Sequence, residues 1–175
     1  MDTAWMDDSG REDGLKPLLD LVRGGRMVEV GSYAGWSTCI FAKYMLSVCA
    51  VDSWELGYDA GDPASSCCPM AEIEAIFDRR TKPLENVFKM KMSSLEASHK
   101  ILDGSQDFVY IDATHTYEAV KQDSGLWLPK VKAGGYIGGH DYVEGWPGVM
   151  KAVQEVLGVP EVVSAGNWIV RVKGA

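Results

Sequence analysis

The sequence has no long apolar run and no leader-like N-terminus. None of its apolar stretches approaches the roughly 20 residues that a membrane-spanning helix needs. Residues 1–13 are acidic and polar, which does not fit the positive start and apolar centre of a signal peptide. These absences predict a cytoplasmic protein that has no membrane partner.

Paired cysteine motifs are absent, which excludes two common uses of this residue. The four cysteines form no Cys-x-x-Cys pair, so a structural zinc site is not expected. Cys39 and Cys49 fall in apolar periodic segments and are typical of small core residues. Cys67 and Cys68 are adjacent, which is poor geometry for a disulfide between them. We therefore predict free thiols in a reducing compartment.

Basic residues are outnumbered, because 17 Lys and Arg face 25 Asp and Glu, which gives a net charge of −8. This balance argues against a general binder of nucleic-acid phosphates. The length of 175 residues fits one domain with a sizeable core. We expect an acidic N-terminal arm over residues 1–13 and a single domain over residues 14–175.

Helical and strand patterns alternate along the chain. Strands are expected at residues 27–30, 48–52, 86–92, 108–112, 136–140, 161–165 and 167–173. Helices are expected at residues 15–23, 36–46, 70–80, 95–102, 117–131 and 147–157, with a break at Gly134-Gly135. Continuous apolar strands fit a parallel sheet that is covered on both faces. The pattern predicts a three-layer α/β/α sandwich, Rossmann-like, with a mostly parallel seven-stranded sheet and an antiparallel C-terminal hairpin.

The most informative segment covers residues 27–37 and joins the first predicted strand to a helix through Gly31 and Gly35. It lacks the middle glycine of the dinucleotide fingerprint Gly-x-Gly-x-x-Gly, which lets the backbone approach a pyrophosphate. Bulky Tyr33 in the turn also disfavours a nicotinamide or flavin dinucleotide. The turn suits a nucleoside ligand without a diphosphate, and the alternative is a tight turn with no ligand.

Two acidic residues accompany this turn. Glu29 lies inside an apolar strand, where a buried charge is costly, so a ligand amino group would suit it. Asp52 ends the second strand and is placed to accept hydrogen bonds from two ribose hydroxyls. Together they indicate one half of a nucleotide-binding α/β fold.

Several runs of the sequence resemble class I S-adenosylmethionine-dependent methyltransferases, in particular the methyltransferase 24 family. Residues 28–37, Val-Glu-Val-Gly-Ser-Tyr-Ala-Gly-Trp-Ser, look like motif I. Residues 110–118 resemble the segment Ile-Asp-Gly-x-His-x-Tyr of that family. Residues 128–129, 133–135 and 139–142 continue the pattern in order and spacing. The resemblance extends from about residue 15 to residue 173.

The resemblance implies S-adenosylmethionine as the cofactor and assigns its contacts. Glu29 would hold the methionine amino group, and Asp52 the ribose hydroxyls. The other expected cofactor residues are Gly31, Ser32 and Gly35 along the turn, Ser37 at the carboxylate, Ser53 and Trp54 after the second strand, Ser93 and Ser94 at the adenine edge, and Asp112. Trp54 is expected to cover the adenine, with a rim aromatic as the alternative. For Ser93 and Ser94 the alternative is a helix N-cap.

A second group, the predicted catalytic residues, follows two later strands. Asp112 ends one of them, and His140 and Asp141 end the next, so these side chains converge if the strands are neighbours. In one interpretation Asp112, His140 and Asp141 bind Mg²⁺ or Mn²⁺, which activates an acceptor hydroxyl. In the other no metal binds, and His115 or His140 is the general base. His115 also fits a residue that only shapes its loop.

The predicted function is transfer of a methyl group from S-adenosylmethionine to a hydroxyl of a small molecule or sugar, with or without a divalent metal. The alternatives are a non-catalytic module that binds S-adenosylmethionine or a nucleoside, and an NAD-dependent oxidoreductase. The acidic segment 55–62 is typical of a solvated face, although its position after the cofactor strand also suits a lid. No nucleic-acid partner is expected, and a homo-oligomer is left open.

Overall fold

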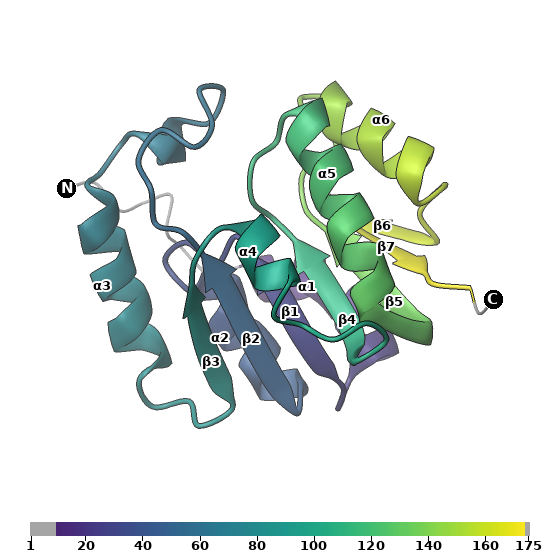
Figure 1. Ribbon diagram of the computed structural model, residues 1–175, viewed down its shortest axis with the longest axis horizontal. Helices are drawn as coiled ribbons and strands as arrows, with labels where there is room; N and C mark the ends of the chain where they lie inside the picture. Colours follow the sequence, from purple (N-terminus) through teal and green to yellow (C-terminus); the bar gives the residue numbers. More distant parts are fainter. Residues whose placement is uncertain (1–9, 174–175) are drawn as a thin grey trace.

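A seven-stranded sheet forms the middle layer of the computed structural model, which describes residues 10–173 (Figure 1). The strands span Arg26–Val30 (β1), Ser47–Asp52 (β2), Val87–Lys91 (β3), Gln106–Ile111 (β4), Val131–Gly139 (β5), Val162–Ser164 (β6) and Asn167–Arg171 (β7). Their order in the sheet is β3-β2-β1-β4-β5-β7-β6. Strands β1 to β5 pair in parallel, whereas β7 is antiparallel to β5 and β6. The predicted mostly parallel sheet with an antiparallel C-terminal hairpin is confirmed.

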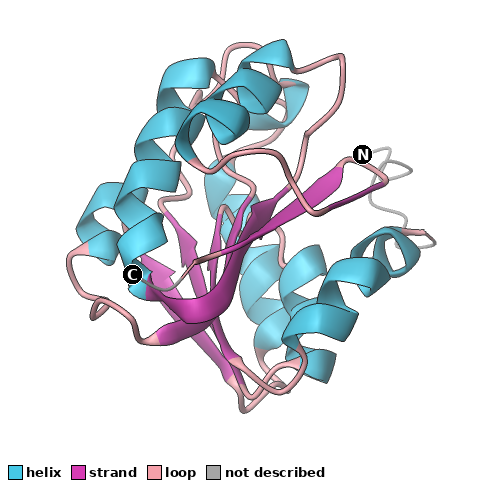
Figure 2. Ribbon diagram, turned by 90° about the vertical axis from the view of Figure 1, so that its right-hand side faces the viewer, coloured by secondary structure: helices cyan, strands magenta, loops and turns pink. Residues whose placement is uncertain are grey.

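Helices cover both faces of this sheet (Figure 1 and Figure 2). One face carries α1 (Arg11–Val22), α2 (Trp36–Tyr44) and α3 (Met70–Thr81), and the other carries α4 (Ser94–Ser98), α5 (Tyr117–Trp127) and α6 (Pro147–Val156). Two short 3₁₀ helices are η2 (Pro63–Ser65) and η3 (Leu128–Lys130). The predicted three-layer sandwich is confirmed. Among residues 10–173, no helix combines the length and the apolar character needed to cross a membrane.

Apolar strand residues point alternately into two cores, one on each face of the sheet. Met27 and Phe108 pack with residues of α1 and α2, whereas Val28 and Val109 pack with Trp127 of α5. Each of these five side chains is at most 1% exposed. Because helices cover both faces, the central strands are continuously apolar in sequence.

The structure corrects the expected break at Gly134-Gly135. Both glycines lie inside β5, which begins at Val131, so the helix expected over residues 117–131 is also shorter. A Cβ on Gly135 would lie 2.8 Å from the carbonyl oxygen of Asp107. Gly135 is therefore needed because β5 passes close to β4 here. Gly134 has φ +80°, and the register between the two strands shifts between the pairs Gln106–Val131 and Phe108–Tyr136, so the glycine pair marks an irregularity inside the strand.

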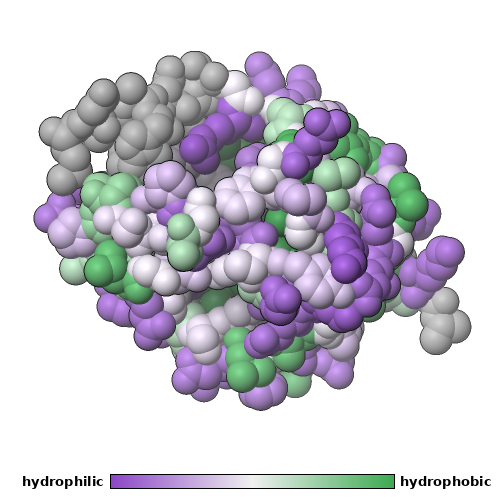
Figure 3. Space-filling model, turned by 90° about the horizontal axis from the view of Figure 1, so that it is seen from above, coloured by the Kyte–Doolittle hydropathy of each residue, from purple (hydrophilic) through white to green (hydrophobic). Residues whose placement is uncertain are grey.

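The carboxyl ends of the parallel strands meet at one edge of the sheet. The backbone N–H of Gly31 donates to the carbonyl of Val51 (2.9 Å), and that of Asp112 donates to the carbonyl of Val30 (2.8 Å). Figure 3 looks onto this end of the molecule, where pale and purple residues predominate in the middle of the view. Ligands of open α/β sheets bind beyond this edge. Of the expected arm over residues 1–13, residues 1–9 lie outside the described part of the chain.

Candidate active site

The turn after β1 approaches the end of β4 more closely than any side chain would allow. Gly31 has φ +89°, and a Cβ there would lie 2.1 Å from the carbonyl oxygen of Asp112. Gly35, with φ +80°, begins α2 as its N-cap residue. Gly31 therefore brings the turn and the end of β4 together at the place where a ligand is expected, whereas Gly35 lies against Phe77 of α3.

Asp52 fixes this turn from the neighbouring strand. Its Oδ2 accepts a hydrogen bond from the backbone N–H of Tyr33 (2.8 Å), and its Oδ1 accepts one from that of Trp54 (2.7 Å). Both donors belong to residues with positive φ, +44° and +50°, which non-glycine residues seldom adopt. Burial raises the pKa of Asp52, and these backbone donors offset part of that rise. Each carboxylate oxygen keeps a lone pair for a further donor.

Glu29 is a fully buried acid beneath the turn, with 0% exposure. Its Oε2 accepts a hydrogen bond from the hydroxyl of Thr38, whereas Oε1 has no hydrogen-bond partner among residues 10–173. Burial raises the pKa of Glu29 to about 7, although the nearby Ser37 and Thr38 hydroxyls counteract it. A buried, half-satisfied carboxylate is costly to the fold, which is typical of a ligand-binding residue.

This burial predicts a pH dependence of stability. Between the ordinary pKa of 4.5 and about 7, folded Glu29 keeps a proton that the unfolded chain releases. The free energy of unfolding therefore falls as the pH rises through this window, by up to roughly 3 kcal/mol from this group, and levels off above it. Glu29→Gln cannot titrate but still accepts from Thr38, so its urea unfolding should lack this component. Equal pH slopes for the variant and the unmodified chain would contradict the prediction.

Two adjoining pockets lie at the carboxyl ends of the strands. The larger, about 270 Å³, includes five of the predicted cofactor residues besides Gly31, namely Asp52, Ser53, Ser93, Ser94 and Asp112. The smaller, about 190 Å³, includes Gly31, Ser32, Ser37 and Asp112. The pockets share Gly31 and Asp112, so a ligand with two unlike halves could occupy both.

Trp54, expected to cover an adenine, lies in the core instead. Its side chain is 6% exposed, its ring lies 5.1 Å from that of Phe77, and its indole N–H donates to the carbonyl of Tyr33 (2.9 Å). It does not line either pocket. The positive φ of Trp54 turns the ring toward α3, which local sequence did not indicate.

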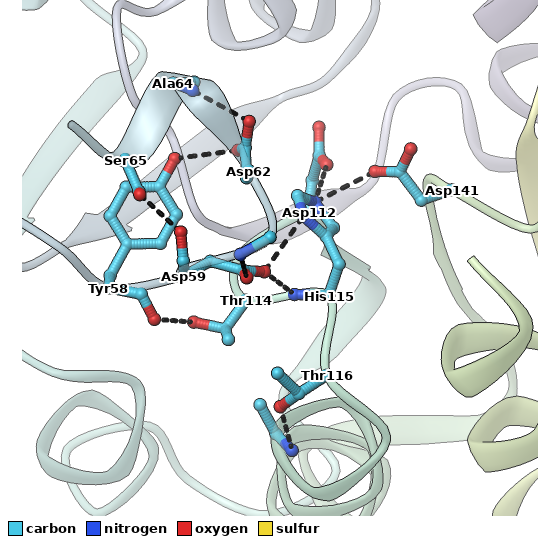
Figure 4. A network of polar contacts seen from close by, with 12 residues as sticks. Tyr58, Asp59, Asp62, Ala64, Ser65, Asp112, Thr114, His115, Thr116 and Asp141 are labelled. Atoms are coloured by element: carbon cyan, nitrogen blue, oxygen red, sulfur yellow. Dashed lines mark hydrogen bonds and ion pairs between the residues drawn. The ribbon is translucent and has the colours of Figure 1, made fainter. Parts of the chain in front are cut away.

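Three of the four predicted catalytic residues come together beside the pockets (Figure 4). Nε2 of His115 lies 2.9 Å from Oδ2 of Asp141 and 3.8 Å from Oδ1 of Asp112. One ligand atom from each residue lies within 4.8 Å of the other two. Asp141 has φ +60°, which carries its side chain back toward His115. The group resembles the predicted metal set, with His115 in place of His140.

Charge coupling within this group is strong. Burial alone would lower the pKa of His115, but Asp112 and Asp141 outweigh it and raise that pKa to about 10. Burial would raise the pKa of Asp141, yet hydrogen bonds from His115 and His140 hold it well below its usual range. A cationic imidazole between two carboxylates is therefore the favoured state of these side chains.

His140 stands at the border of the group. Its Nδ1 lies 3.2 Å from Oδ2 of Asp141, and its backbone carbonyl accepts a hydrogen bond from the indole N–H of Trp168 (3.1 Å). Burial would lower the pKa of His140, but Asp141 and Asp112 raise it to about 9. His140 therefore pairs with the same carboxylate oxygen of Asp141 that His115 contacts.

Sequence reasoning did not single out Asp59, which the structure places against His115. Asp59 is 3% exposed, and its Oδ2 accepts a hydrogen bond from the backbone N–H of His115 (2.8 Å) and lies 3.3 Å from Nδ1 (Figure 4). The hydroxyl of Thr114 donates to the carbonyl of Tyr58 (3.4 Å). The acidic segment 55–62 is thus folded over the site at Asp59, and nothing in the local sequence distinguishes this residue from its acidic neighbours.

Residues 28–142 match a family model described as Methyltransferase domain. The uncharacterized protein y4gI of Sinorhizobium fredii is 25% identical over 130 residues, which cover 71% of this chain and 14% of that protein's length. The calicheamicin methyltransferase CalS11 superposes with a TM-score of 0.64 at 14% identity, over 98% of this chain and 80% of that one. The N-methyltransferase NodS of Bradyrhizobium japonicum gives 0.61 at 16% identity, over 96% and 99%. At these identities the two structures show a shared fold.

Proposed function

This chain belongs to the methyltransferase-domain family of class I S-adenosylmethionine-dependent methyltransferases, and we propose that it methylates a hydroxyl group of a small acceptor such as a sugar. The observation that carries the proposal is the meeting of two pockets at Asp112, beside the group formed with His115 and Asp141. The two pockets would hold the methyl donor, and the acceptor would bind beside Asp112, His115 and Asp141.

The adenosine half of the donor occupies the larger pocket and the methionine half occupies the smaller one. Asp52 accepts hydrogen bonds from the ribose hydroxyls with the lone pairs that its two backbone donors leave free. The unpartnered Oε1 of Glu29 accepts from the methionine amino group. Gly31 and Ser32 let the chain lie close to the donor, since both line the smaller pocket.

Methyl transfer is an in-line displacement, so the protein mainly aligns the acceptor oxygen with the methyl group at about 3–3.5 Å and excludes water. The carboxylates of Asp112 and Asp141 would attract the positively charged sulfonium and so help to bind the donor. Trp146 packs on His115 with ring centroids 4.8 Å apart, and a Cβ on Gly61 of the segment 55–62 would lie 3.4 Å from the same indole. These contacts would close the site over the acceptor.

A divalent ion fits the residues present. Two carboxylates and one imidazole, from Asp112, Asp141 and His115, converge within 4.8 Å, and this donor set suits Mn²⁺ or Mg²⁺. Such an ion, when bound, would lower the pKa of an acceptor hydroxyl. The competing proposal is general-base catalysis without an ion by the unprotonated form of His115 or His140, which the raised pKa values of both residues make the minor form near neutral pH.

Asp52→Ala is predicted to weaken binding of S-adenosylhomocysteine by roughly tenfold to hundredfold, because two charge-assisted hydrogen bonds to the ribose are lost. Calorimetric titration measures this change. Asp103→Ala is the matched control, since Asp103 is 71% exposed and pairs with Lys130 at 2.6 Å. Equal affinities for the two variants would refute the ribose role of Asp52.

The reaction is tested by titration with S-adenosylhomocysteine and NAD, followed by transfer of a labelled methyl group to a panel of sugars, phenols and amines. We expect binding of S-adenosylhomocysteine but not of NAD, and label on the hydroxyl compounds. Binding of NAD alone would favour an oxidoreductase. Tight binding of S-adenosylhomocysteine without transfer would favour a non-catalytic module, and label on amines alone would contradict the hydroxyl acceptor.

A further inference from the structure

A buried carboxylate that the sequence did not indicate forms part of the larger pocket. Asp123 lies on α5, is 7% exposed, and lines this pocket together with Ser93 and Ser94. Each hydrogen-bond donor lowers the cost of burying a carboxylate, and an oxygen without a donor leaves part of that cost in place. The hydroxyl of Ser94 donates to Oδ1 of Asp123 (2.5 Å), and no residue between 10 and 173 donates to Oδ2.

The direction of this hydrogen-bond chain is fixed. The indole N–H of Trp127, which can only donate, points to Oγ of Ser94 (2.8 Å). Ser94 therefore accepts from Trp127 and gives its own proton to Oδ1 of Asp123. Because each hydrogen bond in this series donates toward Asp123, the carboxylate is an acceptor. A ligand that hydrogen-bonds to Oδ2 must therefore bring an N–H or O–H group.

The serines expected at the adenine edge are already engaged. Ser93 caps α4: its hydroxyl accepts from the backbone N–H of Glu96 and donates to the carboxylate of that residue (2.7 Å). Ser94 has given its proton to Asp123. Neither hydroxyl has a proton left to donate to the base, and both residues line the same pocket as Asp123, whose Oδ2 can still accept a hydrogen bond.

We propose that Asp123 is the residue that selects the base of the donor, accepting a hydrogen bond from the 6-amino group of adenine through Oδ2. This inference rests on the proposed function, because it assumes that the larger pocket holds the adenosine half of the donor. The amino group completes the hydrogen bonding of a carboxylate whose burial otherwise raises its pKa to about 6. A base with a carbonyl oxygen at the same position would instead set two acceptors against each other.

The test compares S-adenosylhomocysteine with S-inosylhomocysteine, which carries a carbonyl oxygen in place of the amino group. At a pH near 8, where Asp123 is ionised, the unmodified chain should bind the adenine compound roughly tenfold to hundredfold more tightly. Asp123→Asn should reverse this preference. Ser94 still donates to the amide oxygen of the asparagine, so the amide N–H₂ faces the pocket and pairs with the carbonyl of the inosine compound.

Glu118→Gln removes the same charge from an exposed position of α5 and serves as the control, with the preference of the unmodified chain expected to persist. Equal binding of the two compounds by the unmodified chain would overturn the inference while leaving the proposed function intact. This comparison needs no variant, so it holds even if Asp123→Asn fails to fold. Absence of binding to S-adenosylhomocysteine would instead overturn the proposed function.

Discussion

Asp141→Asn should lower the rate of methyl transfer by roughly 10²- to 10⁴-fold while the affinity for S-adenosylhomocysteine changes little. Asp141 holds Nε2 of His115 at 2.9 Å and Nδ1 of His140 at 3.2 Å, but it does not line the pockets assigned to the donor. Asparagine is preferred to alanine here because it tolerates the φ of +60°. Transfer is measured with the acceptor found in the panel, and affinity by calorimetry.

Glu144→Gln provides the control, since Glu144 is an exposed acid three positions further along the chain. The rate of methyl transfer should be unchanged in this variant. Loss of donor binding in Asp141→Asn would place Asp141 in the donor site and contradict the assignment. Chelation separates the two routes for the proton: if EDTA stops transfer and Mn²⁺ restores it, the metal route stands. Activity that survives EDTA but is lost in His115→Ala supports the general base.

Gly31→Ala is expected to prevent stable folding or to lower the free energy of unfolding by several kcal/mol. A Cβ at this position would lie 2.1 Å from the carbonyl oxygen of Asp112, and the backbone has φ +89°. The turn after β1 and the end of β4 would have to separate, which would open the junction of the two pockets. Urea unfolding measures the loss of stability, and calorimetry measures the loss of donor binding.

Gly24→Ala distinguishes the cost of backbone strain at positive φ from the cost of steric overlap between a Cβ and neighbouring atoms. Gly24 has a similar φ of +78°, but a Cβ there meets no atom within 4 Å among the described residues. Its variant should lose about 1–2 kcal/mol from backbone strain alone. Equal losses in both variants would mean that the close approach of the turn to β4 contributes nothing.

Local sequence was sufficient where a residue's role depends on its own strand. Glu29 and Asp52 could be singled out because a charge inside or at the end of an apolar strand is unusual, and their positions follow from parallel pairing. The parallel pairing of the first five strands follows from the alternation of helices and strands, whereas the order of the strands in the sheet comes from the structure. The break expected at Gly134-Gly135 is an irregularity inside β5 rather than an end of the strand, because the strand continues through both glycines while its register against β4 shifts there.

Residues whose roles depend on distant neighbours could not be found in this way. Asp59 contacts His115, 56 positions away, and Asp123 contacts Ser94, 29 positions away. Both are acids in segments with other acids or polar residues, so only the fold separates them from solvated neighbours. Trp54 was assigned to the cofactor because it follows β2 directly, but its ring packs against Phe77 in the core.

A crystal structure with S-adenosylhomocysteine bound tests the central claim most directly. We predict the ribose at Asp52, the base beside Asp123, and the sulfur facing the group of Asp112, His115 and Asp141. An acceptor oxygen could then approach the methyl position in line from that group. A ligand bound elsewhere, or one whose sulfur faces away from these three residues, would contradict the account.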